Sequence, residues 1–240
     1  MPRWPPRRRF RTGSARRTTL RGLHRRGLRH PAATGRQRDL PRRAARPLVL
    51  AKTVATVDQL SGGRVDFGIG GGWAEQEMAN HGVDPRRRFA RMREHTEAIR
   101  ALWTAREVSY SGRHVSFERA GSWPKPLQWP HPPVLVGGMG PTVFDRVLAY
   151  GDAWLPDYGD EATFDRTLSR VPELRARAED AGRGGVPVVL SGVPHDPRVL
   201  ERCERAGVRR VLTLLPAAGR SVVERCLETY EQAIARWRGE

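Results

Sequence analysis

The groups most able to do chemistry in this sequence belong to two glycine-rich runs. The runs consist of Gly70, Gly71, Gly72 and Trp73, and of Gly137, Gly138, Gly140 and Pro141. Each run follows a short apolar segment and precedes a helical pattern, so each predicts a strand-to-helix turn. Glycine lets backbone N–H groups approach a ligand closely, and a helix N-terminus favours phosphate. The runs therefore predict a site for a phosphorylated cofactor, with a tight turn that binds nothing as the alternative interpretation.

Three side chains near the first run are the candidates for catalysis, namely Trp73, Glu77 and His81. They lie in the loop and short helical segment beyond the glycines, from which polar groups could reach a pocket. A solvated helix turn is the alternative interpretation. The sequence has no Ser-His-Asp order, no H-E-x-x-H and no paired-cysteine spacing, so it predicts neither a hydrolase nor a metal site. Cys203 and Cys226 fall at inward helix positions and are expected to be small core residues.

The elements that must position these residues are short apolar strands alternating with helices. Apolar spacing from residue 47 onward predicts one helix followed by five strand–helix units. The strands are expected at 64–69, 134–136, 153–155, 187–190 and 210–215, with a small hairpin over 108–117. Pro172 should split the helical stretch 161–181, because proline lacks the N–H that an interior helical bond needs.

This alternation indicates an α/β fold in which a parallel sheet is covered by helices. A doubly wound nucleotide-binding sheet would carry G-x-G-x-x-G at its first turn, but Trp73 stands where the third glycine should be. A fold of the (β/α)8 TIM-barrel type is therefore favoured. Eight units need roughly 250 residues, whereas the five predicted units already occupy residues 47–240. The sequence thus predicts an incomplete barrel whose first three units are not recognisable.

The charge of the chain is concentrated at its N-terminus. The formal net charge is +17, and residues 1–46 hold 16 of the 43 Lys and Arg residues against one acid, Asp39. Residues 47–240 carry only +2, from 27 basic and 25 acidic side chains. Lacking Val, Ile and Glu, residues 1–46 are expected to be a disordered Arg-rich segment, with the partial barrel domain in residues 47–240. The segment is either a nucleic-acid-binding arm, since clustered Arg binds phosphates, or an out-of-frame stretch unrelated to the rest.

Four runs of the sequence carry a resemblance to a known family. They are L-A-K-T-V-A-T-V-D-Q-L-S-G-G-R-V-D-F-G-I-G-G-G-W (50–73), E-M-A-N-H-G-V-D-P-R-R-R-F (77–89), W-P-K-P-L-Q-W-P-H-P-P-V-L-V-G-G-M-G-P (123–141) and G-D-A-W-L-P (151–156). Over about residues 47–240 the chain resembles the luciferase-like monooxygenase superfamily. Within that superfamily it looks most like the branch of oxidoreductases that depend on the deazaflavin coenzyme F420.

The resemblance implies a (β/α)8 barrel that binds a flavin or deazaflavin at the carboxyl ends of its strands. Coenzyme F420 is the expected cofactor, with FMN as the alternative. The implied chemistry is hydride transfer with F420 or monooxygenation with reduced FMN. By position, the first glycine run would lie beside the cofactor ring and the substrate, and the second near the ribityl–phosphate side. We also expect a small-molecule substrate, a cytoplasmic location and no membrane association, with a homodimer as an open option.

The chain departs from the family pattern at its N-terminus. Family members carry three further strand–helix units, which supply substrate-side polar groups and a backbone bulge behind the cofactor ring, and residues 1–46 show no counterpart. An incomplete barrel exposes strand edges, so we expect poor solubility and impaired cofactor binding. The alternative function is nucleic-acid binding through the Arg-rich segment.

Overall fold

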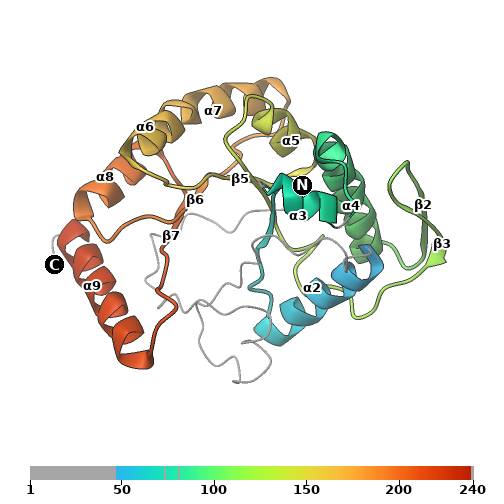
Figure 1. The fold of residues 1–240 in the computed structure, drawn as a ribbon, viewed down its shortest axis with the longest axis horizontal. Coiled ribbons are helices and arrows are strands. Elements are labelled where there is room, and N and C mark those ends of the chain that lie inside the picture. The colour runs from blue at the N-terminus through green and yellow to red at the C-terminus, as the bar shows by residue number, and fades with distance from the viewer. Residues whose placement is uncertain (1–46, 73, 81, 239–240) are drawn as a thin grey trace. The chain divides into compact units, whose positions relative to one another are not determined.

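A computed structural model of the chain describes residues 47–72, 74–80 and 82–238 (Figure 1). The Arg-rich segment 1–46 lies outside the described residues, as do Trp73 and His81. The described residues divide into two compact units, 47–134 and 135–238. Each unit therefore contains one of the two glycine-rich runs.

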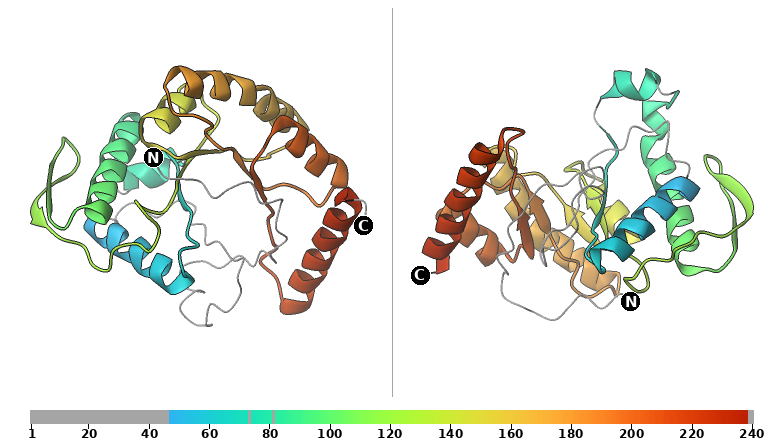
Figure 2. Two further views of the ribbon diagram at one scale, coloured as in Figure 1. Left: turned by 180° about the vertical axis from the view of Figure 1, so that it is seen from behind. Right: turned by 90° about the horizontal axis from the view of Figure 1, so that it is seen from below.

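The first unit is built around two packed helices. Its elements are α2 (Pro47–Ser61), β1 (Phe67–Ile69), α3 (Glu75–Asn80), the 3-10 helix η1 (Pro85–Arg87), α4 (Arg88–Thr104), β2 (Val108–Ser111) and β3 (Ser116–Ala120). Helices α2 and α4 lie side by side (Figure 2), and Val54 and Ile99 belong to one buried cluster between them. The Trp103 indole N–H donates to the Ala51 carbonyl oxygen at 2.9 Å, so the buried ring keeps a polar partner.

Strand β1 is shorter than the sequence predicts, because the residues before it are bonded to the end of α2. The carboxylate of Asp58 is fully buried and lies 3.4 Å from the Val65 N–H. The Arg64 N–H donates to Ser61 Oγ at 3.0 Å. These two backbone donors serve the helix end instead of a sheet ladder, so the strand begins only at Phe67.

The predicted hairpin is confirmed. Strands β2 and β3 pair antiparallel, with Tyr110 opposite Phe117 and their ring centroids 6.2 Å apart. The Glu94 carboxylate of α4 accepts the backbone N–H groups of His114 and Val115 at 2.6 and 3.0 Å. Helix α4 therefore fixes the turn of the hairpin.

The second unit is a run of parallel strands that follow one another in chain order. Its elements are β4 (Val134–Gly137), α5 (Val143–Tyr150), β5 (Ala153–Leu155), α6 (Glu161–Ser169), α7 (Val171–Asp180), β6 (Val189–Ser191), α8 (Pro197–Ala206), β7 (Arg210–Leu212) and α9 (Arg220–Arg238). Strand β4 pairs with β5, and β6 with β7. Bridges from Trp154 to Val188 and from Asp157 to Ser191 join β5 to the β6 segment.

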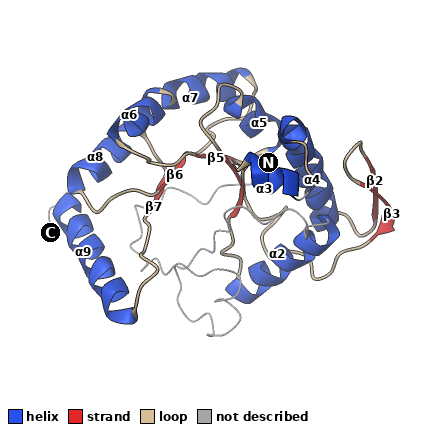
Figure 3. Cartoon of the chain, viewed as in Figure 1, coloured by secondary structure: helices blue, strands red, loops and turns tan. Residues whose placement is uncertain are grey.

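This order identifies a singly wound layer. Right-handed connections between successive parallel neighbours all return on one side, whereas a doubly wound sheet reverses direction and covers both faces. Helices α6 to α9 lie together on one side of β5, β6 and β7 (Figures 1 and 3). The prediction of barrel-type strand–helix units is confirmed in this part of the chain.

The two faces of the strand layer carry different side chains. One buried cluster consists of Leu135, Ala153, Leu155 and Val189, with Leu212 packed against it. Trp154 lies between two members of that cluster in β5, so its side chain points to the opposite face. There it meets Phe144 of α5 edge-on, with ring centroids 4.9 Å apart. The helices therefore pack on the Trp154 face, and the aliphatic cluster marks the other.

The break in the helical stretch 161–181 falls just before Pro172 rather than at it. Helix α6 ends at Ser169, and α7 begins at Val171. Pro172 therefore stands in the first turn of α7, where its missing N–H would have no intrahelical partner. The predicted split is confirmed, and its position is corrected by two residues.

Candidate cofactor-binding site

The turn between β4 and α5 carries the second glycine run. Helix α5 begins at Val143, two residues after Pro141. Gly138 has a φ of 119°, a conformation that L side chains rarely adopt. At Gly140, no atom of the described residues lies within 4 Å of the place that a Cβ would take. The turn thus needs one glycine for its backbone shape and has open space beside another.

Two backbone carbonyls of this turn accept hydrogen bonds from side chains behind it. The Trp154 indole N–H donates to the Gly138 carbonyl oxygen at 2.9 Å. Arg170, between α6 and α7, donates from Nη1 to the Met139 carbonyl oxygen at 2.9 Å. The Thr167 hydroxyl lies 3.4 Å from Met139 Sδ. The turn is therefore held in shape by the protein itself, which reduces the ordering that a ligand would have to impose.

The start of α5 is electropositive. The Val143 N–H donates to the Gly140 carbonyl oxygen at 3.1 Å and opens the helix. Thr142 is the N-cap residue, but its hydroxyl accepts a bond from Arg146 Nη1 at 2.7 Å and does not cap the helix. The buried Arg146 and the Asp145 carboxylate, which pairs with Arg177, both lie in the first turn of α5, so the helix dipole is what makes this end positive. An anion such as phosphate is favoured at this end.

These features fit the phosphate end of a flavin or deazaflavin cofactor. Backbone that is anchored from one side, open space at Gly140 and a positive helix end together suit a bound phosphate. Within this run, the predicted residues Gly137, Gly138, Gly140 and Pro141 lie in one continuous turn.

The turn between β1 and α3 is different. Gly70, Gly71 and Gly72 follow β1 and are partly buried, and Gly72 has a φ of 77°. A Cβ at Gly71 would lie 2.5 Å from Cε1 of Phe89 in α4. At this position glycine makes room for the protein's own aromatic ring, which gives Gly71 a role in packing.

The structure does not describe the side chains of the predicted catalytic residues Trp73, Glu77 and His81. Trp73 and His81 lie outside the described residues. Glu77 belongs to α3, but its side chain is also outside the description. The catalytic role of all three remains a prediction.

The carboxyl ends of β6 and β7 bring together polar groups that sequence reasoning missed. His195 Nε2 lies 3.0 Å from Thr213 Oγ1 and 3.7 Å from Cys226 Sγ, and the Tyr230 ring packs edge-on against the imidazole. Burial lowers the pKa of His195, which favours the neutral imidazole. Cys226 is only partly buried, so its prediction as a core residue is wrong, whereas Cys203 is buried and its thiol pKa is raised to about 12 by that burial. The sequence signal that could have found this group is the position of His195 in the loop after the predicted strand 187–190.

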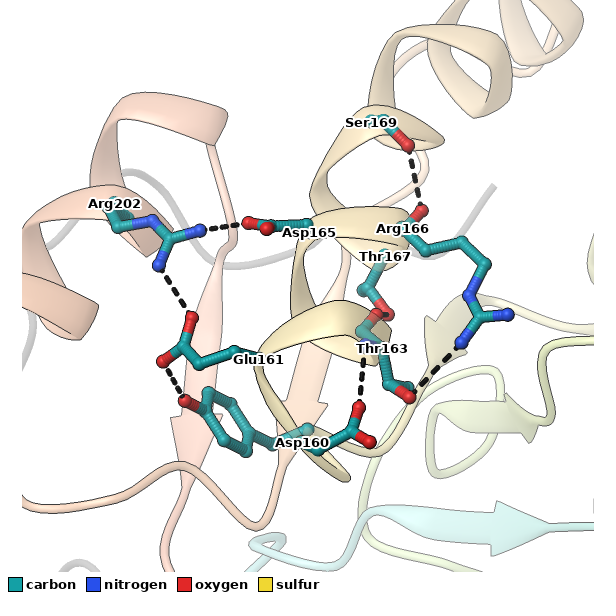
Figure 4. A network of polar contacts seen from close by, with 9 residues as sticks. Asp160, Glu161, Thr163, Asp165, Arg166, Thr167, Ser169 and Arg202 are labelled. Carbon is teal, nitrogen blue, oxygen red and sulfur yellow. Dashed lines mark hydrogen bonds and ion pairs between the residues drawn. The ribbon is translucent and has the colours of Figure 1, made fainter.

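The loop after β5 is tied to α8 by a network of polar contacts (Figure 4). The Tyr158 hydroxyl donates to the Glu161 carboxylate. Arg202 of α8 pairs with Glu161 Oε2 at 2.9 Å and with the Asp165 carboxylate. Burial, followed by the bond to Glu161, raises the pKa of Tyr158 to about 12. These charged groups are already paired with one another, which indicates a role in holding the loop.

Comparison with known proteins links the chain to redox enzymes. The family model described as luciferase-like monooxygenase matches residues 40–202. An uncharacterised protein of Mycobacterium tuberculosis strain H37Rv is 41% identical over 172 residues, which cover 71% of this chain and 59% of that protein. The chain therefore spans less than two thirds of the length of this relative.

Two relatives with named activities use different cofactors. An F420-dependent glucose-6-phosphate dehydrogenase of Amycolatopsis mediterranei is 34% identical over 138 residues, 55% of this chain and 41% of that protein. An FMNH2-dependent dimethylsulfone monooxygenase of Pseudomonas putida is 30% identical over 139 residues, 57% of this chain and 38% of that protein.

The solved structures similar to this chain are less than 25% identical to it in sequence, so they inform only the fold. An F420-dependent secondary alcohol dehydrogenase, in complex with an F420–acetone adduct, has a TM-score of 0.67 and 18% identity over 86% of this chain and 79% of its own. The F420-dependent tetrahydromethanopterin reductase of Methanopyrus kandleri has a TM-score of 0.64 and 17% identity over 86% of this chain and 83% of its own. The predicted fold class, an incomplete (β/α)8 TIM barrel, is confirmed.

Proposed function

The chain belongs to the luciferase-like monooxygenase family, and on this premise we propose that it is an oxidoreductase that binds coenzyme F420, with FMN as the alternative. The observation that carries the proposal is the β4–α5 turn, which is anchored from behind and opens beside Gly140 at the positive end of α5. F420 would supply hydride transfer, and reduced FMN would supply oxygen activation. The named relatives depend on one or the other, which supports the cofactor class.

The two glycine runs take different roles in this proposal. Gly137, Gly138, Gly140 and Pro141 bind the ribityl–phosphate end of the cofactor. Gly70, Gly71, Gly72 and Trp73 lie beside its ring, with Glu77 and His81 as candidates for moving a proton at the substrate. The support for the first assignment is the geometry of the β4–α5 turn, whereas the second rests on position in the sequence.

Titration of the purified full chain with F420 and, separately, with FMN tests the proposal. Saturable quenching of the fluorescence of one cofactor is the expected result, with a weak Kd of about 10–100 micromolar, in keeping with the impaired binding expected of an incomplete barrel. In Gly138→Ala the binding should weaken at least about tenfold, because the φ of 119° strains any residue with a Cβ. Gly182→Ala is the matched control, since Gly182 has a φ of 63° and no described atom near its Cβ position, in a different turn. If the chain binds neither F420 nor FMN, the proposal is contradicted.

Substrate, location and assembly are part of the same proposal. We propose a small-molecule substrate, because the relatives with named activities act on small molecules, a sulfone and a sugar phosphate. Among the residues described, no helix combines the length and the apolar character needed to cross a bilayer. The cytoplasmic location that we propose rests on the family resemblance instead. A homodimer is the assembly we would test for, by light scattering on the eluting protein. The named relatives are oxidoreductases and give no support to the nucleic-acid-binding alternative.

A further inference from the structure

We infer that Trp154 and Arg170 are positioning residues that aim the backbone N–H groups of Met139 and Gly140 at the cofactor phosphate. This inference rests on the proposed function and goes one step deeper. It assigns the groups of the β4–α5 turn that donate to the phosphate and the side chains that orient them.

The geometry of the peptide bond carries the first step. In a trans peptide the C=O of one residue and the N–H of the next are fixed in opposite directions. Neither of the two peptides from Gly138 to Gly140 is cis. Trp154 binds the Gly138 carbonyl, so the Met139 N–H points away from Trp154. Arg170 binds the Met139 carbonyl, so the Gly140 N–H points away from Arg170.

The two anchoring side chains act from the same side of the turn. The Arg170 guanidinium carbon lies 5.8 Å from the centroid of the Trp154 ring, and Trp154 belongs to the helix-facing side of β5. Both N–H groups therefore point to the opposite side. Within the described part of the chain, no hydrogen bond from either N–H is found, and the space beside Gly140 is open. Two adjacent N–H groups with one direction form a concavity suited to an anion.

Arg170 is itself held firmly enough to set the turn. Its guanidinium stacks on the Phe144 ring at 4.3 Å from the centroid, and its Nε lies 3.3 Å from Glu173 Oε2. The side chain is 18% exposed. A group locked by packing and by a second bond keeps the backbone it contacts in one orientation before a ligand arrives.

The chain offers a matched control in Arg177. Its guanidinium also lies over the Phe144 ring, at 5.9 Å, and it pairs with Glu173 and with the Asp145 carboxylate. No contact of Arg177 with the β4–α5 turn is found among the described residues. In this control Arg177→Met is combined with Asp145→Asn, so that no unpaired acid is left in the first turn of α5. The control thus removes a similar stacked cation from the same ring and leaves the turn's carbonyls bound.

The test compares a cofactor with its phosphate-free counterpart. Wild type, Arg170→Met, Arg170→Lys and the Arg177→Met/Asp145→Asn control are titrated with FMN and riboflavin, and with F420 and its deazariboflavin core, and their Tm values are recorded. In Arg170→Met, affinity for the phosphate-bearing form should fall about tenfold, as for loss of one charge-assisted hydrogen bond, while affinity for the phosphate-free form stays the same. Arg170→Lys should recover part of the loss, and the Arg177→Met/Asp145→Asn control should behave as wild type. Trp154→Phe, which keeps a ring but loses the N–H, should act in the same direction as Arg170→Met.

The outcomes separate this inference from the proposed function. If wild type binds a cofactor and Arg170→Met keeps the full preference for its phosphate, the inference is overturned and the proposed function stands. Equal loss of both forms in Arg170→Met would likewise overturn it, because a merely structural role lowers both affinities. If wild type binds neither cofactor, the proposed function fails, and the inference fails with it.

Discussion

The two glycine-rich turns look alike in sequence and differ in what their glycines do. In the β1–α3 turn, Gly71 leaves space for Phe89 of α4. In the β4–α5 turn, Gly140 has open space beside it, and the carbonyls of the two preceding residues are bound from behind. Glycine content alone therefore does not separate a packing requirement from a ligand-binding one. An atom at the place of the missing Cβ identifies a packing requirement, as at Gly71, but an empty place is shared by Gly182 and does not identify a binding turn by itself. The bound carbonyls of Gly138 and Met139 are what distinguish the β4–α5 turn.

The largest effect in this comparison is expected for Gly71→Ala. Its Cβ would lie 2.5 Å from Phe89 Cε1, and such overpacking costs about 2 kcal/mol. The free energy of unfolding, measured in urea, should fall by about that amount. Phe89→Leu in the same chain should restore part of it, because the ring that meets the new methyl group is gone. An unchanged stability in Gly71→Ala would show that the ring gives way without cost.

Gly140→Ala should show the reverse behaviour. Since no described atom lies within 4 Å of the added methyl group, stability should stay within about 0.5 kcal/mol of wild type. Cofactor affinity should fall about fivefold, because the methyl group occupies the space beside the N–H that meets the phosphate. Fluorescence titration and urea unfolding on one preparation check both halves. If Gly140→Ala instead loses stability and keeps its cofactor affinity, the glycines of both turns serve packing, and the proposed difference between the turns is wrong.

A third region, at the carboxyl ends of β6 and β7, should make the stability of the chain depend on pH, because it contains the partly buried His195. Its pKa in the folded chain is lowered from 6.5 by burial, so the unfolded chain takes up the proton first on acidification. Stability from this group is therefore present above about pH 6.5 and is lost as the pH falls below that value. Unfolding measured between pH 8 and pH 5 should show this loss in wild type, and a weaker one in His195→Asn. Identical pH profiles would contradict it.

The smallest effect is expected for Arg202→Met. Its ion pairs with Glu161 and Asp165 are solvent-exposed, with 62% and 66% of the carboxylate side chains accessible. Pairs of this kind contribute little to stability. Tm should fall slightly, by less than in Gly71→Ala, and cofactor affinity should not change. A loss of affinity as large as in Arg170→Met would give the β5–α6 loop a role in binding.

Much of the fold was readable from the sequence, because apolar runs and turn residues act locally. All five predicted strands occur. Asp-Pro is a local helix-start signal, and helix α8 begins at Pro197, where the Arg198 N–H donates to the Asp196 carboxylate at 2.8 Å. The start of β1 was not readable, since it depends on the buried carboxylate of Asp58 at the end of the preceding helix. Local pattern gives the elements, and tertiary contacts set where they begin.

The site was readable only in part. The sequence located both glycine runs and could not rank them, because Phe89 lies 18 positions after Gly71 and its ring is placed by the fold. The two anchors of the β4–α5 turn come from 16 and 31 positions away in the chain. Trp154 lies in a run that carried the family resemblance, but its bond to Gly138 follows only from the pairing of β4 with β5. Nothing in the sequence indicated that Arg170 would bind a carbonyl of this turn.

Backbone amide signals of the isotopically labelled chain, followed during titration with the cofactor and with its phosphate-free counterpart, test the binding role of the β4–α5 turn most directly. The Met139 and Gly140 amides should shift strongly with the phosphate-bearing cofactor and hardly at all with the phosphate-free one. Unmoved Met139 and Gly140 amides at saturation with the cofactor would contradict that role.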